Sequence, residues 1–259
     1  MEFEGKTLLI TGAAGNIGKA VIKELYKEGA NVALVDINLA ALEAAAKELN
    51  LAPERSLLIA ADVSKEEDAE RYVKETVERF GGIDVFHNNA GINGVRYKIE
   101  DINIEQFRHV VDVNVYGVAL GLKYVMRQMR KQGHGSIINT SSHVAKLPMP
   151  NSTDYSVTKT AVVMLTKIAA QEMRGTGVRI NCVMPGIIHS EMIMRNYMRD
   201  NPGCTEADAV AGFSKNIPIG RWCELEEVAS VVSFLASERS SYITGAAIPI
   251  DGGTTANQY

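Results

Sequence analysis

The stretch of residues 6–36 constrains the fold more than any other part of the chain. Residues 6–11 (KTLLIT) form an apolar run typical of a buried strand, and residues 12–18 (GAAGNIG) form a glycine-rich turn. A helical pattern then extends to Gly29, and residues 31–36 (NVALVD) form a second apolar run that ends in an acid. This order of strand, glycine turn, helix, strand and acid is typical of a βαβ unit that binds a dinucleotide.

The residue at the end of the second strand also favours one cofactor. Glycines let the backbone approach a pyrophosphate, whose charge is stabilised at the N-terminus of the next helix. Asp36 can accept hydrogen bonds from ribose hydroxyls and would repel a 2′-phosphate, and the next residue is Ile37 rather than Arg or Lys. We therefore expect NAD rather than NADP. The cofactor-binding candidates in this unit are Gly12, Asn16, Ile17, Gly18, Asp36 and Ile37.

Apolar runs and helical patterns alternate along the rest of the chain. Further strands are expected at residues 56–60, 83–86, 136–139, 178–183 and 245–250, and helices at 39–49, 64–80, 104–130, 153–175 and 224–236. We expect Ser64 and Glu67 to form a capping box at the start of one helix. Repeated β-then-α units predict an α/β fold: a single Rossmann-type, doubly wound domain spanning residues 1–259, with a mostly parallel seven-stranded sheet.

Polar and glycine-rich clusters follow the expected strands. In open α/β sheets, ligands bind at the carboxyl ends of the strands. The clusters therefore predict one binding rim. They lie at residues 12–18, 36, 62–63, 88–91, 139–142 and 185–190, and they add Asp62, Val63, Asn89, Ala90 and Gly91 to the cofactor-binding candidates.

Tyr155 and Lys159 are four residues apart on an expected helix, so they share one helix face. Ser142 follows the apolar run that precedes this helix. A nearby cation favours the phenolate, and bringing a tyrosine pKa from about 10 to about 7 requires roughly 4 kcal/mol. One close ammonium and a second positive charge from a cofactor could supply that free energy. Such a tyrosine can exchange a proton with an alcohol or a carbonyl oxygen. Spacing alone is more typical of a buried tyrosine and a surface lysine, but the position at the dinucleotide rim favours catalysis.

These motifs together resemble those of the short-chain dehydrogenase/reductase family over essentially the whole chain, in its NAD-type alcohol/ketone dehydrogenase branch. The matching features are Asn-Asn-Ala-Gly at 88–91, Ser142 thirteen residues before Tyr155, Tyr-x-x-x-Lys, Asn114, and Pro185-Gly186 followed by Ser190. The glycine turn departs from the usual pattern because Asn16 replaces its middle glycine, and the resulting spacing also resembles the longer, epimerase-type branch. Asn tolerates left-handed backbone well, so we interpret Asn16 as a tolerated substitution.

The resemblance implies a role for each matching residue. Tyr155 would be the general acid/base, and Ser142 would hydrogen-bond the substrate oxygen. Lys159 would lower the pKa of the tyrosine and hold the nicotinamide ribose, and Asn114 would keep a water that connects Lys159 to solvent. The implied catalytic residues are thus Asn114, Ser142, Tyr155 and Lys159, and further cofactor contacts are implied for Tyr155, Lys159, Pro185, Gly186, Ile188 and Ser190. The implied reaction is hydride transfer between NAD and a secondary alcohol or ketone.

Residues 190–215 are expected to form a helical lid over the substrate. Their methionines predict an adaptable apolar surface, although a methionine-rich packing face is an equally good interpretation. The substrate-binding candidates are Ser142, His143, Met149, Tyr155 and Met192. An apolar pocket favours an apolar alcohol or ketone, with a cyclic or steroid-like compound as one option, because several stretches also resemble family members that act on cyclic ketones.

Composition bounds the other functions. A net charge of −4 without a basic block argues against nucleic acid, and the chain has no run of 18 apolar residues, so no membrane span is expected. The three cysteines lack metal-ligand spacing, so we expect no metal site. Reduced cysteines and an acidic N-terminus unlike a signal peptide favour a cytoplasmic location. Members of the family are usually homotetramers, which is the expected assembly.

Two other functions remain open at this level. One is an epimerase or dehydratase that uses the same tyrosine and lysine with a retained NAD. The other is a non-catalytic NAD-binding sensor or scaffold, although such proteins commonly lose the tyrosine or the lysine and this chain keeps both. The expected partner in the favoured function is a small-molecule alcohol or ketone substrate.

Overall fold

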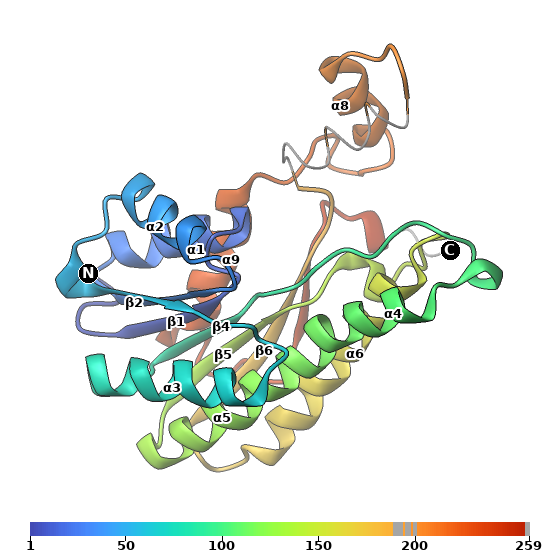
Figure 1. The fold of residues 1–259 in the computed structure, drawn as a ribbon. Helices are drawn as coiled ribbons and strands as arrows, with labels where there is room; N and C mark the ends of the chain where they lie inside the picture. The colour runs from blue at the N-terminus through green and yellow to red at the C-terminus, as the bar shows by residue number, and fades with distance from the viewer. Residues whose placement is uncertain (189–193, 195–197, 199–200, 257–259) are drawn as a thin grey trace.

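The computed structural model describes residues 1–188, 194, 198 and 201–256 (Figure 1). Its centre is a seven-stranded sheet in the order β3-β2-β1-β4-β5-β6-β7, and every neighbouring pair of strands is parallel. The order reverses between β1 and β4, which is the point where such sheets open a ligand-binding crevice. The strands are β1 (Thr7–Thr11), β2 (Asn31–Asp36), β3 (Ser56–Ala60), β4 (Val85–Asn88), β5 (Gly135–Thr140), β6 (Val178–Pro185) and β7 (Ala247–Ile250).

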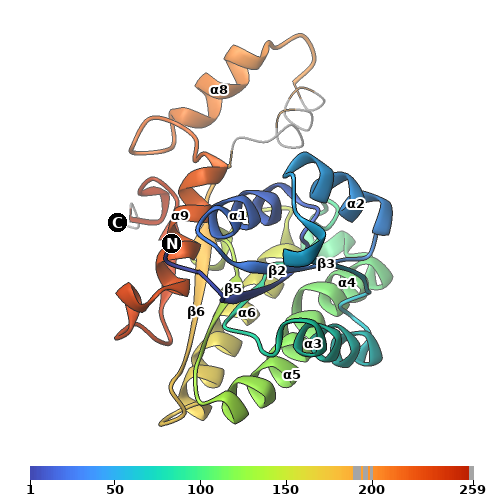
Figure 2. The ribbon, with the colours of Figure 1, turned by 90° about the vertical axis from the view of Figure 1, so that its left-hand side faces the viewer.

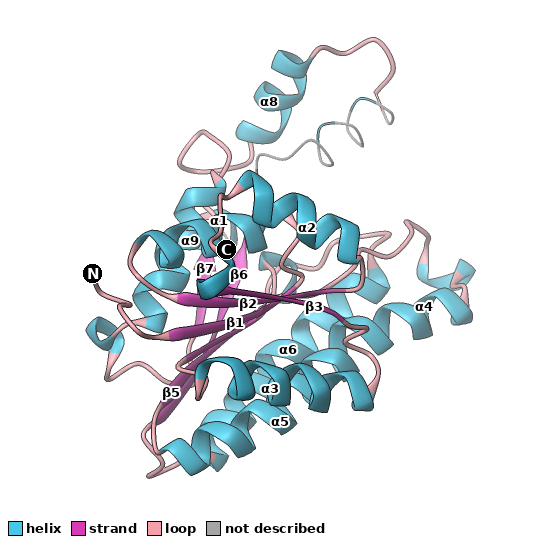
Figure 3. Ribbon diagram, turned by 60° about the vertical axis from the view of Figure 1, so that its left-hand side comes forward, coloured by secondary structure: helices cyan, strands magenta, loops and turns pink. Residues whose placement is uncertain are grey.

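Helices cover both faces of the sheet. Figure 3 shows α1, α2 and α9 on one face and α3, α5 and α6 on the other. The α-helices are α1 (Asn16–Lys27), α2 (Leu39–Glu48), α3 (Glu66–Phe80), α4 (Ile104–Val111), α5 (Gly117–Gln132), α6 (Thr153–Glu172), α8 (Glu206–Ser214) and α9 (Leu225–Ala236). A π-helical turn, η3 (Asp112–Tyr116), joins α4 to α5. The short 3-10 turns are η1 (Pro53–Arg55), η2 (Ile99–Asp101), η4 (His143–Ala145), η5 (Glu238–Ser240) and η6 (Thr254–Ala256).

Two hydrophobic clusters lie on the two faces of the sheet and explain why apolar residues occupy successive positions in the middle of a strand such as β1. Leu8 and Ile10 of β1 pack in the cluster beneath α1 and α9, whereas Leu9 between them packs in the cluster beneath α3, α5 and α6. Alternate side chains of a strand point to opposite faces, so a strand with both faces covered must be apolar throughout. Each fully buried leucine contributes about 1.5–3 kcal/mol. The predicted fold class is confirmed.

Local structure corrects several predicted boundaries. Strand β4 begins at Val85 rather than at residue 83, because the Ile83 N–H donates to the Gln132 side chain instead of to a neighbouring strand. Strand β7 begins at Ala247, two residues after the predicted start at Gly245. The single helix predicted for residues 104–130 is divided by the π turn η3.

The predicted capping box at Ser64 is wrong. The Ser64 hydroxyl donates to Asp62 Oδ1 at 2.7 Å, and helix α3 begins after Lys65 without a side-chain cap. Acidic residues in the first turn of α3 complement the helix dipole instead. The structure places a capping box at α9, where the side chains of Glu224 and Glu227 each accept from the other residue's backbone N–H.

Helix α8 stands apart from the sheet. Figures 1 and 2 both show it beyond the layers that the other helices form, joined to them through the chain after β6 and the chain before α9. It belongs to the segment predicted as a lid, of which residues 194, 198 and 201–215 are described. A separate small cluster of buried side chains holds this part together: Met194, Ala209, Ile217 and Trp222, with Ile187 packed against them.

Candidate active site

The glycine turn between β1 and α1 packs so tightly that two of its residues can only be glycine. Gly12 has a φ of +64°, and a Cβ on it would lie 2.9 Å from the Ala90 Cα. A Cβ on Gly18 would overlap the Gly12 carbonyl oxygen. Helix α1 begins after Gly15 without a side-chain cap. The first N–H groups of the helix therefore have no side-chain acceptor and remain available to a ligand. This is the arrangement that a phosphate group needs.

Asp36 lies beside this turn, as the sequence predicts. One carboxylate oxygen accepts from the Ala14 N–H at 3.2 Å, and the other accepts from the Asn38 N–H at 3.3 Å. The carboxylate is thus held at the end of β2 and remains partly exposed. Ile37 next to it is 72% exposed. An exposed apolar side chain at this place offers no positive charge to a 2′-phosphate.

Asn89 is held by a network that local sequence patterns do not indicate. The Thr11 hydroxyl oxygen accepts from the backbone N–H groups of Asn89 and Ala90, at 3.0 and 3.1 Å. The Asn89 amide donates to the carbonyl oxygens of Thr11 and Gly12, at 3.1 and 3.3 Å. The strand-ending Asn-Asn-Ala-Gly motif is therefore fastened directly to the glycine turn.

Thr140 extends this network into the core. Its hydroxyl donates to Asn89 Oδ1 at 3.2 Å, so the 2.9 Å contact with His87 Nε2 requires that His87 be the donor. Burial lowers the pKa of His87 to about 3, so its ring is neutral at pH 7 and can be protonated on Nε2 alone. His87 is a core histidine with one nitrogen bonded and Nδ1 without a partner among the described residues.

Asn114 is fully buried in the π turn and clamps the chain after β4. Its Oδ1 accepts from the Ile92 N–H at 2.8 Å, and its Nδ2 donates to the Ile92 carbonyl at 2.9 Å and to the Thr158 hydroxyl at 3.1 Å. A Cβ on Gly91 would meet both Asn114 Oδ1, at 3.2 Å, and Lys159 Nζ, at 3.0 Å. The asparagine and the lysine thus flank the same glycine, which explains why residue 91 has no side chain.

Lys159 is 3% exposed, and its Nζ donates to the Thr140 carbonyl oxygen at 2.9 Å. Burial lowers the pKa of Lys159 to about 8. Its Nζ lies 5.5 Å from the centroid of the Tyr155 ring, so the predicted pairing of the two side chains on one helix face is present. The neighbouring Ser141 hydroxyl donates to the Lys159 carbonyl at 2.6 Å and joins β5 to α6.

Within the protein alone, the pKa of Tyr155 is raised, whereas the predicted fall in this pKa also requires the positive charge of a cofactor. Burial of the hydroxyl raises the pKa, and a hydrogen bond with Ser142 lowers it only in part. Lys159 does not reverse this effect, because its ammonium faces the tyrosine ring and the Thr140 carbonyl. Ser142, Tyr155 and Lys159 therefore meet as predicted, but the protein alone does not favour the phenolate. A further positive charge beside the hydroxyl is needed.

The remaining predicted site residues come from several other segments of the chain. The His143 ring is within 3.2 Å of the Pro185 carbonyl oxygen, which fastens the chain after Ser142 to the end of β6. Met149 is partly exposed in the loop before α6. Asp62 and Val63 follow β3. Gly186 packs closely against Asp251, because a Cβ on Gly186 would lie 2.8 Å from the Asp251 Cα. Ile188 is buried and forms an isolated β-bridge with Cys223. Ser190 and Met192 lie outside the described residues.

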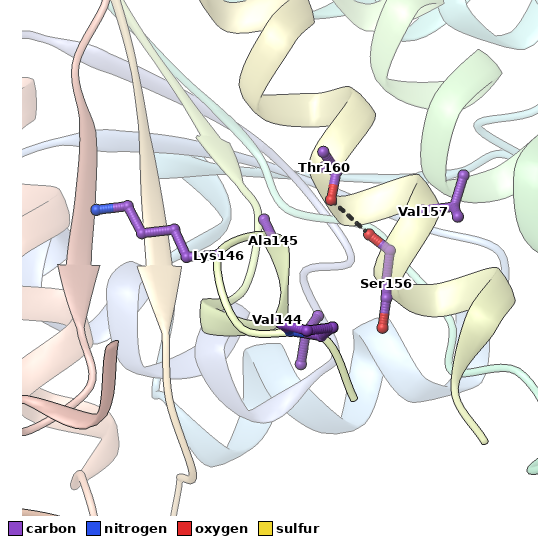
Figure 4. A pocket seen from close by; sticks show the side chains of 7 residues that line it. Val144, Ala145, Lys146, Ser156, Val157 and Thr160 are labelled. Carbon is purple, nitrogen blue, oxygen red and sulfur yellow. Dashed lines mark hydrogen bonds between the residues drawn. The ribbon is translucent and has the colours of Figure 1, made fainter. Parts of the chain in front are cut away.

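A surface pocket of about 310 Å³ lies beside α6 but is separate from this group (Figure 4). It is lined by Val144, Ala145, Lys146, Pro148, Ser156, Val157 and Thr160. Ser156 and Thr160 lie one position after Tyr155 and Lys159, which turns them about 100° around the helix. The pocket is therefore on another face of α6 from the candidate catalytic residues.

Metal and membrane features are not seen in the described part of the chain. No group of three or more His, Cys, Asp or Glu residues there is placed to hold a metal ion. No described helix is both long enough and apolar enough to cross a membrane.

Comparison with known proteins agrees with this geometry. Residues 12–255 match the family described as Enoyl-(Acyl carrier protein) reductase. Levodione reductase of Leifsonia aquatica is 40% identical over 256 residues, which cover 98% of this chain and 96% of the relative. A solved structure of levodione reductase matches with a TM-score of 0.93 at 38% identity, covering 98% of this chain and 99% of that chain.

This chain belongs to the short-chain dehydrogenase/reductase family.

Two other members of the family are similar along nearly their whole length. A 2,5-dichloro-2,5-cyclohexadiene-1,4-diol dehydrogenase of Sphingobium indicum is 35% identical and covers 98% of this chain and 99% of its own. A crystal structure of an NAD⁺-bound xylitol dehydrogenase matches with a TM-score of 0.90 at 33% identity, over 98% of this chain and 100% of that chain. The matches to both solved structures therefore extend over the whole architecture described above.

Proposed function

We propose that this protein is an NAD-dependent oxidoreductase that transfers hydride between NAD(H) and a secondary alcohol or ketone. The observation that carries the proposal is the meeting of Ser142, Tyr155 and Lys159 at the carboxyl end of the sheet, beside the glycine turn. A hydroxyl that can exchange a proton, a second hydroxyl bonded to it and a buried ammonium are what an alcohol–carbonyl interconversion requires of a protein. The NAD⁺-bound xylitol dehydrogenase and the two other relatives are all named as dehydrogenases or reductases.

The residues at the crevice fit a dinucleotide. The backbone of the glycine turn packs closely at Gly12 and Gly18, helix α1 has no side-chain cap, and Asp36 is held where ribose hydroxyls can donate to it. When bound, NAD supplies the hydride acceptor, and its nicotinamide carries a positive charge. The residues proposed to hold it are Gly12, Asn16, Ile17, Gly18, Asp36, Ile37, Asp62, Val63, Asn89, Ala90, Gly91, Tyr155, Lys159, Pro185, Gly186, Ile188 and Ser190.

The protein's own side chains divide the proton chemistry. Tyr155 Oη takes the proton of the alcohol or returns it to the carbonyl oxygen, and Ser142 donates a hydrogen bond to the same oxygen. Lys159 has a pKa of about 8 and is therefore mostly charged at pH 7. Its charge favours the phenolate once a second positive charge lies near. Asn114 is proposed to keep a water near Lys159, since it already flanks Gly91 together with that lysine.

The proposed substrate is an apolar secondary alcohol or ketone of moderate size, with a ring as the favoured shape. The cyclohexadiene-diol dehydrogenase supports a ring by its name. The contacts proposed for the substrate are Ser142, His143, Met149, Tyr155 and Met192. We further propose that residues 1–259 form one domain and that residues 190–215 act as its substrate lid, because α8 stands beyond the other helices, in the chain between β6 and α9, with its own small apolar cluster.

A panel of alcohols and ketones, followed by the absorbance of NADH, tests this function. Wild type should oxidise cyclic secondary alcohols with NAD, and Tyr155→Phe should lower kcat by about a thousandfold because the proton carrier is lost. Tyr242→Phe, at a fully exposed tyrosine, is the matched control. A Tyr155→Phe variant that kept full turnover would refute the mechanism. Turnover of acidic or phosphorylated alcohols alone would refute the apolar substrate.

An epimerase or dehydratase with retained NAD is a second candidate, favoured by the spacing of Gly12, Gly15 and Gly18. This candidate predicts that NAD stays bound through extensive dialysis. It also predicts that no alcohol yields net NADH. Mass spectrometry of the dialysed protein under non-denaturing conditions distinguishes it from the first candidate.

We also propose a cytoplasmic homotetramer. The exposed side chains Val157, Met164 and Ile168 form an apolar stripe on α6, and exposed Tyr116 lies in the neighbouring π turn. Apolar faces of this kind are typical of subunit contacts. The three cysteines are free in the structure, which suits a reducing compartment. Light scattering after size exclusion measures the assembly, and a monomer would contradict it.

A further inference from the structure

Asp154 immediately precedes Tyr155 and is an unusual buried acid. Its side chain is 0% exposed. One oxygen, Oδ1, accepts from the Tyr155 N–H at 2.7 Å. The other, Oδ2, is buried and has no hydrogen-bond partner within the described part of the chain. A carboxylate oxygen that is removed from water without a partner costs free energy, so its presence calls for an explanation.

The unpaired oxygen points into the segment of residues 92–98, which follows the Asn-Asn-Ala-Gly motif. A Cβ on Gly94 would overlap the Asp154 carboxylate, so the carboxylate occupies the space that a side chain at residue 94 would take. The Tyr97 hydroxyl is also buried without a partner among the described residues. Burial and the nearby Asp154 charge raise the pKa of Tyr97, so its hydroxyl keeps its proton and can donate it.

This segment is fastened at both ends. Asn114 holds Ile92 through two hydrogen bonds of 2.8 and 2.9 Å, and the Tyr97 N–H donates to the Asn151 carbonyl at 3.2 Å. Between these points Val95 is exposed. Figure 1 shows the chain after β4 running alongside the chain that leads into α6. The segment therefore forms a wall next to the N-terminus of the helix that carries Tyr155.

We propose that Asp154 is a positioning residue that fastens residues 92–98 to the start of α6, through the Tyr97 hydroxyl and the backbone of Gly94, and thereby fixes the wall of the substrate site. This inference rests on the proposed function for its effect on substrate. A buried donor and a buried acceptor that face each other satisfy one another once Tyr97 donates to Oδ2. The same carboxylate holds the Tyr155 N–H, so one side chain ties the wall to the candidate catalytic residue.

Four variants distinguish a role of Asp154 in positioning residues 92–98 from a general contribution to the stability of the protein. Asp154→Ala removes both attachments. Asp154→Asn keeps an acceptor for the Tyr155 N–H and a group of the same shape for Tyr97. Tyr97→Phe removes only the hydroxyl and leaves the α6 contact. Asp101→Asn, at an exposed acid in η2, is the matched control.

Hydrogen exchange of the peptide that covers residues 92–98 tests the fastening without any substrate. Asp154→Ala and Tyr97→Phe should exchange at least about tenfold faster there, while Asp154→Asn and Asp101→Asn stay near wild type. Unchanged exchange in Asp154→Ala overturns the proposal, whether or not the wild type turns over any alcohol. If Asp154→Ala does not fold, Tyr97→Phe decides in the same way.

Steady-state kinetics test the effect on the substrate wall. Asp154→Ala and Tyr97→Phe should raise the KM for the alcohol about tenfold and change kcat by less than about threefold, with the KM for NAD unchanged. Asp154→Asn should restore the wild-type KM. Faster exchange with an unchanged KM would overturn the role in the substrate site. A loss of kcat as large as that of Tyr155→Phe would place Asp154 in the proton chemistry and overturn positioning. Absence of any turnover by wild type would count against the proposed function, and the exchange experiment would still decide the fastening.

Discussion

The sheet body and the α8 region are held together in different ways. By the sheet body we mean residues 1–188 and 224–256, and by the α8 region residues 201–223. In the sheet body, both faces of every central strand are packed, and backbone approaches backbone so closely that Gly12 and Gly18 leave no room for a Cβ. The α8 region has one small cluster in which Trp222 is the largest side chain.

This difference shows where change is tolerated. A backbone contact leaves no room for another side chain, so the sheet body accepts few substitutions at its rim. A cluster of a few side chains can be rebuilt with other apolar residues at a modest cost. The proposed cofactor site is therefore placed on the part that resists change, and the proposed lid is placed on the part that can vary with the substrate. The following predictions test that division.

The largest effect is expected at the backbone contact of the glycine turn. Gly18→Val would push its side chain into the Gly12 carbonyl, and the dissociation constant for NAD should rise at least about 100-fold. Titration followed by tryptophan or NADH fluorescence measures it. Gly175→Ala is the control, because Gly175 has a φ of +74° and open space around it. That variant should lose about 1 kcal/mol of stability with unchanged NAD affinity. If Gly18→Val bound NAD as tightly as the wild type, the sheet body would tolerate change at its rim, and the contrast with the α8 region would be wrong.

A buried charge in the sheet body should cost stability. Below about pH 8, Lys159 is charged in both the folded and the unfolded chain, and its buried charge lowers stability by a constant amount. Between its folded pKa of about 8 and the ordinary lysine pKa of 10.5, the unfolded chain keeps the proton and the folded chain loses it, so stability rises with pH. Lys159→Met should therefore be more stable than wild type by about 2 kcal/mol at pH 7, after allowance for the lost bond to Thr140.

The gain should disappear above about pH 10.5, where Lys159 is neutral in both states. Urea unfolding at a series of pH values measures the free energy of unfolding. Lys167→Met is the control, since that lysine is exposed. A Lys159→Met variant less stable than wild type at pH 7 would show that the ammonium is compensated within the core.

Trp222→Ala should loosen the α8 region and leave the sheet body intact. The Trp222 ring is buried and its Nε1 donates to the Val210 carbonyl at 3.2 Å. A Trp→Ala change in a core typically costs about 3–5 kcal/mol, which is more than so small a cluster can supply. We expect faster exchange in residues 201–223, a KM for the alcohol raised about tenfold, and an NAD affinity within about twofold of wild type. Trp222→Phe should retain most of the packing. If the whole protein instead lost roughly these 3–5 kcal/mol and melted at a correspondingly lower temperature, the two regions would unfold as one cooperative unit.

The smallest effect is expected at the exposed end of β2. Asp36→Ala combined with Ile37→Arg replaces a repulsive charge by an attractive one for a 2′-phosphate, and the ratio of NADP to NAD efficiency should rise about fivefold. Initial rates with each cofactor measure this ratio, and Ile37→Gln serves as the control. A wild type that used both cofactors equally well would remove the charge argument from Asp36.

The sequence predicts most of the fold because its signals are local. Every strand of the sheet was expected within about two residues of its observed start, because a strand covered on both faces must be apolar at successive positions. The glycine turn, Tyr155 and Lys159 could likewise be identified from spacing along the chain. The roles of these residues stay predictions until the variants are measured.

The parts that could not be predicted depend on contacts between distant segments. The Thr11 hydroxyl accepts a hydrogen bond from the Asn89 N–H, 78 residues further along the chain. The Thr140 hydroxyl donates to the Asn89 side chain, and the Thr140 carbonyl accepts from Lys159. No local pattern reports such bonds. The rise of the Tyr155 pKa within the protein alone could not be predicted either, since burial of the hydroxyl depends on what surrounds it and not on the residue four positions ahead.

The π turn η3 has a consequence for how the chain length can vary. A π turn closes its hydrogen bond one residue later than an α turn, so it holds one inserted residue. Deleting one residue from 112–116 would allow α4 and α5 to merge into a regular helix, and it would rotate the preceding residues by about 100° relative to the following ones. The Asn114 amide would then leave Ile92 and Thr158. The one extra residue in the π turn thus determines the direction in which the Asn114 side chain points. A homologue that is one residue shorter here and has a regular helix is expected to lack the hydrogen bonds from this asparagine to Ile92 and Thr158.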